Sequence, residues 1–162
     1  MIFRIGLGND IHKLSSESKH LFIGGVDIPF DKGVVAHSDG DVLIHSICDA
    51  ILGAMANRDI GYHFPDTDPS YKNISSSKLL SKVVNLAKEE GYKINNIDCT
   101  VILQKPKLSG YIQEIRSTLA KILNIDINAV SVKAKTNEGL GPIGNSEAVA
   151  ANSIVLLIKD EK

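Results

Sequence analysis

The stretch that decides the expected fold is residues 36–54, which read AHSDGDVLIHSICDAILGA. It opens with polar residues and a glycine and continues with apolar residues at helical spacing. We therefore predict a helix that Asp39 or Asp41 caps and that ends around residues 57–58. Its buried side would be a broad apolar stripe formed by Val42, Ile44, Ile47, Ala50, Ile51 and Ala54.

The same helix carries three chemically active side chains, Asp41, His45 and Asp49, at intervals of four residues. Residues four apart lie on one face of a helix, so we expect these three to point in the same direction. An imidazole between two carboxylates is a common composition for a metal site. The simpler alternative is a solvated helix face with one histidine that binds nothing.

A second polar pair strengthens the metal hypothesis. Asp10 and His12 lie near the end of a first strand predicted for residues 3–8, and they share a face of it while Ile11 points the other way. Together with His45, they would offer two imidazoles and one carboxylate to a single ion. Three protein ligands with an open fourth position are typical of a catalytic zinc site rather than a structural one.

The composition limits the class of protein. The 162 residues suit a single domain over residues 1–162, and 43% hydrophobic with 23% charged residues is near the globular average. The formal net charge is −1 and lysine and arginine do not cluster, so we expect no nucleic-acid partner. The longest apolar run, Ile154–Ile158, is too short to cross a bilayer, so we expect no membrane partner either.

Two cysteines indicate the redox environment. Cys48 and Cys99 are far apart and belong to no paired-cysteine motif, so neither a disulfide framework nor a thiolate zinc site is indicated. The N-terminal residues also become polar too early for a secretion signal. We expect two buried thiols in a bacterial cytoplasm, and a mature plastid protein is the alternative left open.

The rest of the chain alternates between strand and helix patterns. The segment from Asp59 to Pro69, which contains several turn-forming residues, is either an ordinary connector or a lid over a site. The remaining elements are predicted as a hairpin of strands at 21–23 and 26–31, helices at 75–90 and 108–123, and strands at 92–103, 130–134 and 148–158. This order predicts an α/β or α+β fold in which helices pack on one face of a mixed sheet.

Polar motifs recur along nearly the whole chain, from Gly6 to Ile158, in an order that is similar to one known family. The motifs are GNDIH at 8–12, IGGV at 23–26, SDGDV at 38–42 with His45, Asp49 and Gly53 after it, DIG at 59–61, FPDTDP at 64–69, QKPK at 104–107 and KAKTNEGLG at 133–141. The chain resembles the 2-C-methyl-D-erythritol 2,4-cyclodiphosphate synthases of the non-mevalonate isoprenoid pathway.

The resemblance implies a homotrimer whose sheets surround a threefold axis and whose active sites lie between subunits. It also implies a reaction in which the 2-phosphate of 4-diphosphocytidyl-2-C-methyl-D-erythritol 2-phosphate attacks the β-phosphorus of the same molecule. Cytidine monophosphate leaves and a cyclic diphosphate closes. Because the nucleophile belongs to the substrate, metal ions that neutralise and align the phosphates would be the main catalytic resource.

By resemblance, Asp10, His12 and His45 bind zinc, which agrees with the hypothesis drawn from the residues alone. Asp49, and likewise Asp41, would hydrogen-bond a ligand histidine and fix its orientation.

The resemblance assigns catalytic roles at the far end of the chain as well. Glu138 matches the ligand of a second cation, magnesium or manganese, that bridges the diphosphate. Lys135 and Thr136 lie beside it. Lys135 departs from the threonine or serine of many members and adds a positive charge near the phosphates.

Substrate contacts are implied from several parts of the chain. His37 and Ser38 would bind phosphate, unless they only cap the helix, and Asp59 and Asp66 would bind methylerythritol hydroxyls, unless they only form turns. The implied set also includes Ile60, Gly61 and Phe64 near these carboxylates, Leu103, Pro106 and Lys107 beside cytidine, and Lys133, Ala134, Lys135 and Thr136 of a neighbouring subunit.

Two other functions are compatible with these residues. A zinc phosphohydrolase would use the same ligands to activate water, and product analysis separates it from a cyclase, which consumes no water. A non-catalytic, metal-stabilised nucleotide-binding trimer is the second alternative. It leaves Glu138 and the loop around Asp66 without an evident task.

Overall fold

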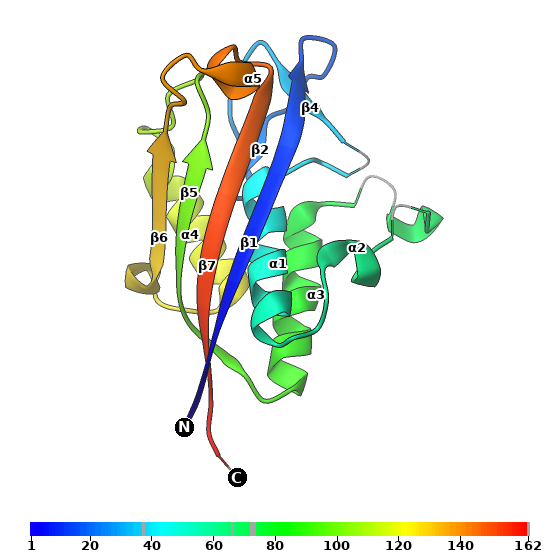
Figure 1. The fold of residues 1–162 in the computed structure, drawn as a ribbon, viewed down its shortest axis with the longest axis vertical. Helices are drawn as coiled ribbons and strands as arrows, with labels where there is room; N and C mark the ends of the chain where they lie inside the picture. Colours follow the sequence, from blue (N-terminus) through cyan, green and yellow to red (C-terminus); the bar gives the residue numbers. More distant parts are fainter. Residues whose placement is uncertain (37, 66, 72–73, 162) are drawn as a thin grey trace.

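A five-stranded mixed sheet with helices on one face forms the body of the protein (Figure 1). The computed structural model describes residues 1–36, 38–65, 67–71 and 74–161. The strands follow the order β4-β1-β7-β5-β6, in which β5 and β6 are parallel and the other neighbours antiparallel. Their bounds are β1 Ile2–Ser15, β4 Gly33–Val35, β5 Lys93–Ile102, β6 Val130–Lys135 and β7 Ala148–Lys159. The expected α+β class is confirmed.

Three longer helices cover the inner face of the sheet: α1 Val42–Ala54, α3 Ser76–Glu89 and α4 Ile112–Leu123. Most residues of α1 are buried, because it lies between the sheet and α3. The shorter elements are β2 Phe22–Ile23, β3 Val26–Asp27, α2 Ile60–His63, η1 Pro69–Tyr71, η2 Ile127–Ala129 and α5 Gly141–Gly144. Within the described ranges, every helix is too short or too polar to cross a membrane.

The first strand is longer than the sequence indicated. β1 continues to Ser15 instead of ending at Gly8, because β7 pairs with it along almost its whole length. The two strands come from opposite ends of the chain, so no local pattern reveals this pairing. Asp10 and His12 therefore lie inside a strand and not at its end.

Other boundaries also differ from the predicted ones. α1 ends before residues 57–58, because Ala56 takes a left-handed φ of 57°. α4 begins slightly later than predicted, at Ile112. The strand predicted for residues 26–31 pairs only over its first two residues, and Pro29 has no N–H with which to extend the pairing.

Helix α1 and strand β1 touch through their backbones. A Cβ atom on Gly8 would lie 1.8 Å from the carbonyl oxygen of Ser46, and one on Gly6 would lie 1.8 Å from that of Ala50. Any side chain at these two positions would therefore overlap the helix. Glycine at positions 6 and 8 sets the distance between α1 and the sheet.

The other face of β1 is apolar and exposed. Phe3, Ile5, Leu7 and Ile11 share this face with the polar Asn9, and Ile5 is 74% exposed. Ile154 of β7, which pairs with Leu7 in the register, is 49% exposed on the same face. A group of large apolar side chains exposed on a sheet surface marks an interaction surface.

We expect Gly8→Ala to lower the thermal unfolding midpoint strongly, because the new methyl group meets a backbone carbonyl that cannot rotate away. Overpacking typically lowers the free energy of unfolding by about 1–3 kcal/mol. Because the obstacle here is rigid backbone, we expect a loss at or above the upper end of this range. Circular dichroism during heating measures the shift.

Gly53→Ala is the matched control, since its Cβ would lie 3.9 Å from the nearest atom outside its own turn, the carbonyl oxygen of Leu7. Alanine is the better helix former by about 1 kcal/mol, so this variant should be as stable as the unmodified chain or more so. Equal midpoints for Gly8→Ala and Gly53→Ala would disprove the close contact.

Candidate active site

Asp10, His12 and His45 meet where α1 begins beside β1. His45 Nδ1 and His12 Nε2 lie 3.0 and 2.9 Å from Asp10 Oδ2, and the two ring nitrogens lie 3.0 Å apart. Asp10 and His12 share the inner face of β1, and His45 lies in the first turn of α1. The predicted convergence is confirmed: the three residues form a group that could hold a metal ion.

The spacing of these atoms fits an ion. Ligand atoms bound tetrahedrally at zinc distances lie about 3.3 Å from one another, and the three separations here are only slightly shorter. The donors are two imidazole nitrogens and one carboxylate oxygen, a set that zinc accepts readily.

The charges of the group also favour a cation. Burial by itself would raise the pKa of the Asp10 carboxyl, but hydrogen bonds and positive charge from His12 and His45 hold this pKa well below its usual range. Burial would lower the pKa of His45, yet the Asp10 carboxylate outweighs it and raises that pKa. The ionised carboxylate and the two ring nitrogens lie close together. A positive charge between them, either a proton or a metal ion, is needed to stabilise this arrangement.

Asp41 does not project beside His45 as the interval of four predicted. It is the N-cap of α1 and fully buried, and its carboxylate accepts the N–H groups of Gly24 at 2.9 Å, Gly25 at 2.6 Å and Ile44 at 3.0 Å. Burial raises its pKa, and these three hydrogen bonds oppose the rise. Asp41 therefore joins the β2–β3 turn to the start of α1.

Asp49 lies one turn beyond His45 and serves a different neighbour. Its Oδ1 accepts the N–H of Ile60 at 2.8 Å, so among the described contacts it anchors the start of α2 and not a ligand histidine. Partial burial raises its pKa. A role in orienting His45, expected for both Asp49 and Asp41, is not what these hydrogen bonds show.

The far side of the His45 ring contacts Ser76, a residue for which the sequence predicted only a place in the helix at 75–90. His45 Nε2 lies 2.9 Å from the hydroxyl oxygen of Ser76 and 3.4 Å from that of Ser38. Ser76 is fully buried and also hydrogen-bonds Asp39. Because Ser76 belongs to another helix, no spacing in the sequence links it to His45.

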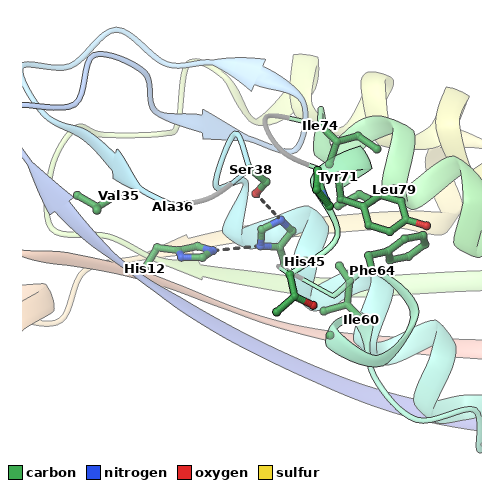
Figure 2. Close-up of a pocket in the computed structure, with 13 residues that line it drawn as sticks. His12, Val35, Ala36, Ser38, His45, Ile60, Phe64, Tyr71, Ile74 and Leu79 are labelled. Atoms are coloured by element: carbon green, nitrogen blue, oxygen red, sulfur yellow. Dashed lines mark hydrogen bonds between the residues drawn. The ribbon is translucent and has the colours of Figure 1, made fainter.

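The metal group opens into a cavity of about 850 Å³ (Figure 2). His12 and His45 lie on one wall, and Phe64 and Tyr71 pack edge to face in the opposite wall. The segment expected to be a connector or a lid contributes Ile60, Gly61, Phe64, Thr67 and Pro69 to the cavity wall, and its described part holds α2. The cavity is lined by His12, Val35, Ala36, Ser38, His45, Ile60, Gly61, Phe64, Thr67, Pro69, Tyr71, Ile74 and Leu79.

Several implied substrate contacts therefore lie together. Ser38, Ile60, Gly61 and Phe64 line the cavity. Asp59 caps α2 through the N–H of Tyr62 at 2.9 Å. The other two, His37 and Asp66, lie outside the described residues.

A second set of implied residues lies in and after strands β5 and β6, toward the other edge of the sheet. Leu103 follows β5 and donates its N–H to Lys135 at the end of β6, 2.9 Å away. Thr136 donates its hydroxyl to Glu138 at 2.8 Å, and Glu138 takes a left-handed φ of 50°. The set, which comprises Leu103, Pro106, Lys107, Lys133, Ala134, Lys135, Thr136 and Glu138, is absent from the lining of the described cavity.

Strands β7 and β5 separate these two sets within one chain, since the sheet order places β1 and β6 apart (Figure 1). None of the second set joins the first set in the lining of the described cavity.

The two cysteines are both buried free thiols, as expected. Cys48 lies in α1 and Cys99 in β5, and burial raises the pKa of each thiol, that of Cys99 to about 11. Neither takes part in the metal group.

Comparison with known proteins agrees with the resemblance seen in the motifs. Residues 3–158 match the model of the YgbB family. Curated relatives named 2-C-methyl-D-erythritol 2,4-cyclodiphosphate synthase include that of Alkaliphilus oremlandii, 54% identical over 96% of this chain and 99% of the relative. The relative from Clostridioides difficile bears the same name and is 56% identical over 96% of each chain.

Solved structures agree as well. IspF of Plasmodium falciparum, in a CDP complex, superposes with a TM-score of 0.86 at 40% identity over 98% of this chain and 97% of that one. The bifunctional IspDF from Campylobacter jejuni gives a TM-score of 0.93 at 41% identity over 99% of this chain, which spans 43% of that longer protein. The chain therefore belongs to the YgbB family, the family of the 2-C-methyl-D-erythritol 2,4-cyclodiphosphate synthases.

Proposed function

We propose that the chain converts 4-diphosphocytidyl-2-C-methyl-D-erythritol 2-phosphate into 2-C-methyl-D-erythritol 2,4-cyclodiphosphate and cytidine monophosphate, as a phosphorus–oxygen lyase of isoprenoid precursor synthesis. The observation that carries the proposal is the convergence of Asp10, His12 and His45 at the wall of a cavity. Family membership supplies the reaction, and the geometry supplies a place where two phosphates of one molecule can be held together.

The ion proposed for this group is zinc, which Asp10, His12 and His45 would hold, because two imidazoles and one carboxylate are a ligand set typical of zinc sites that bind a substrate. Bound there, zinc would neutralise phosphate charge and hold the reacting phosphates in line. Ser38 lies at the same wall and can donate its hydroxyl to phosphate. The apolar side chains of Ile60 and Phe64 exclude water, which keeps the internal phosphate as the nucleophile.

The second cation, magnesium or manganese, is assigned to Glu138 of a neighbouring copy. Its carboxylate is exposed and accepts the hydroxyl of Thr136, so it can reach a diphosphate that enters from another chain. Carboxylate oxygen suits a hard cation. Lys107 and Lys133 to Thr136 would then contact cytidine and its phosphates, with Leu103 and Pro106 shaping the turn that holds the base.

We propose that the assembly is a homotrimer in which the apolar outer face of β1 meets a neighbouring copy. Two features support this: the exposed row that contains Ile5 and Leu7, and the separation of the implied contacts into two sets. A cytoplasmic location remains our expectation, and the buried free thiols are compatible with it.

The test of the reaction is to incubate the purified protein with the cytidyl substrate and magnesium, then to follow the products by phosphorus NMR. Cyclic diphosphate and cytidine monophosphate in equal amounts are expected. Incorporation of ¹⁸O from labelled water into a product phosphate would favour the phosphohydrolase, and an unchanged substrate would favour the non-catalytic nucleotide-binding trimer.

We expect about one zinc per chain in the purified protein and almost none in His45→Ala, because that variant loses one of the three protein ligands. Elemental analysis measures both. His20→Ala is the control, since His20 is exposed and hydrogen-bonds Asp27 away from the cavity. An unchanged zinc content in His45→Ala would remove the proposed ligand set.

Glu138→Gln should keep its zinc and lose about a hundredfold in cyclisation rate, since only the charged ligand of the second cation changes. The deficit should be largest at limiting magnesium. Glu89→Gln, at the exposed end of α3, is the control for loss of a surface charge. Equal rates for Glu138→Gln and the unmodified protein at every magnesium concentration would contradict the role of Glu138.

Static light scattering should report about three times the 17.5 kDa mass of the chain. Ile5→Asp, on the exposed face of β1, should shift the protein towards smaller species because it places a charge in the proposed interface. A fully active monomer would refute the shared active site.

A further inference from the structure

The two nitrogens of the His45 ring face different surroundings. Nδ1 lies 3.0 Å from Asp10 Oδ2. It also lies 3.0 Å from His12 Nε2 (Figure 2). Nε2 faces the start of α3, 2.9 Å from the hydroxyl oxygen of Ser76. A neutral imidazole that binds a metal through Nδ1 must carry its proton on Nε2, and a buried N–H needs an acceptor.

Asp39 decides which way the Ser76 hydroxyl points. Its carboxylate accepts the backbone N–H of Ser76 at 2.9 Å through Oδ2, and the Ser76 hydroxyl lies in close hydrogen-bond contact with Oδ1. A serine hydroxyl has one proton, and a carboxylate only accepts, so this proton points to Asp39. The lone pairs of the Ser76 oxygen are left for His45, which must donate from Nε2.

Water cannot substitute easily for this contact. Ser76 is fully buried, and the His45 side chain is only 12% exposed. Ser38 is a poorer acceptor, because its oxygen lies 3.4 Å from Nε2 and already accepts the N–H of Gly40 at 3.1 Å. Ser76 is therefore the main partner of Nε2 among the described residues.

We propose that Ser76 and Asp39 are positioning residues that hold His45 in the tautomer and orientation in which Nδ1 binds the metal. The inference deepens the proposed function, since it rests on a metal ion at the Asp10, His12 and His45 group. It adds a chain of two hydrogen bonds, from the ring to Ser76 and from Ser76 to Asp39, that ties α3 to a ligand on α1.

The hydrogen bonds through Ser76 link the start of α3 to the segment before α1 and to the His45 ring. Ser76 is the first residue of that helix, and Asp39 lies in the segment that leads into α1. Removing the Ser76 hydroxyl leaves the Nε2 proton without its acceptor and leaves the ring free to turn. Groups that orient metal-binding histidines in this way typically contribute about 10- to 100-fold to metal affinity.

The experiment titrates the metal-free full-length protein with cobalt(II) and follows the visible d–d absorption, with zinc competition to obtain affinities. Ser76→Ala should bind cobalt about 10- to 100-fold more weakly than the unmodified protein. Asp39→Asn should weaken binding too. In either orientation of the amide, its NH₂ group would face an N–H or O–H group whose hydrogen bond the Asp39 carboxylate accepts in the unmodified protein.

Ser75→Ala is the matched control, since Ser75 is the N-cap of the same helix and makes no capping hydrogen bond through its side chain in the described structure. Its cobalt affinity and spectrum should equal those of the unmodified protein. Ser76→Thr keeps a hydroxyl and should retain most of the affinity, which a purely steric role of Ser76 does not predict.

A second readout addresses the tautomer directly. In the zinc-loaded protein, ¹⁵N-edited NMR should show a His45 proton on Nε2 that exchanges slowly with water, and Ser76→Ala should lose this slow exchange.

Cobalt affinity and spectrum of Ser76→Ala equal to those of the unmodified protein would overturn the positioning role. If Ser76→Ala does not fold, Asp39→Asn decides in the same way. An unmodified protein that binds no cobalt would instead remove the proposed metal site, and the positioning role with it.

Discussion

The close contact between α1 and β1 is the constraint on which the rest of the structure depends. Gly6 and Gly8 let the carbonyls of the helix approach the strand to a distance that no side chain allows. The next two residues on the same face of the strand are Asp10 and His12, which lie where the helix begins and where His45 extends from its first turn. The spacing of helix and strand therefore also sets the spacing of the metal group.

Carboxylates surround the start of α1, and each has a different partner. Asp10 faces the two imidazoles, Asp39 accepts from Ser76, Asp41 caps the helix and Asp49 anchors α2. The four carboxylates therefore connect the start of α1 to the two imidazoles, to α3 and to α2.

The sequence predicted the parts of the site that depend on local periodicity. Alternation in a strand placed Asp10 and His12 on one face, and the apolar stripe after residue 41 located the helix that carries His45. The spacing of four residues between Asp41 and His45 gave a wrong prediction for the direction of the Asp41 side chain. Asp41 is the N-cap and lies outside the helical repeat, so its carboxylate turns back to the N–H groups of Gly24 and Gly25. Contacts between distant segments, such as those of Ser76 or the long β1–β7 pairing, have no local pattern and needed the fold.

Strand β1 is organised in steps of two residues: one row carries Gly6, Gly8, Asp10 and His12, and the other carries Phe3, Ile5, Leu7, Asn9 and Ile11. A single residue inserted or deleted near Gly8 would exchange the two rows beyond that point. Asp10 and His12 would turn to the outer face, and Ile11 would take a place on the inner face. The metal group and the outer apolar row would thus be lost together, so the length of this strand tolerates less change than the identity of most of its residues.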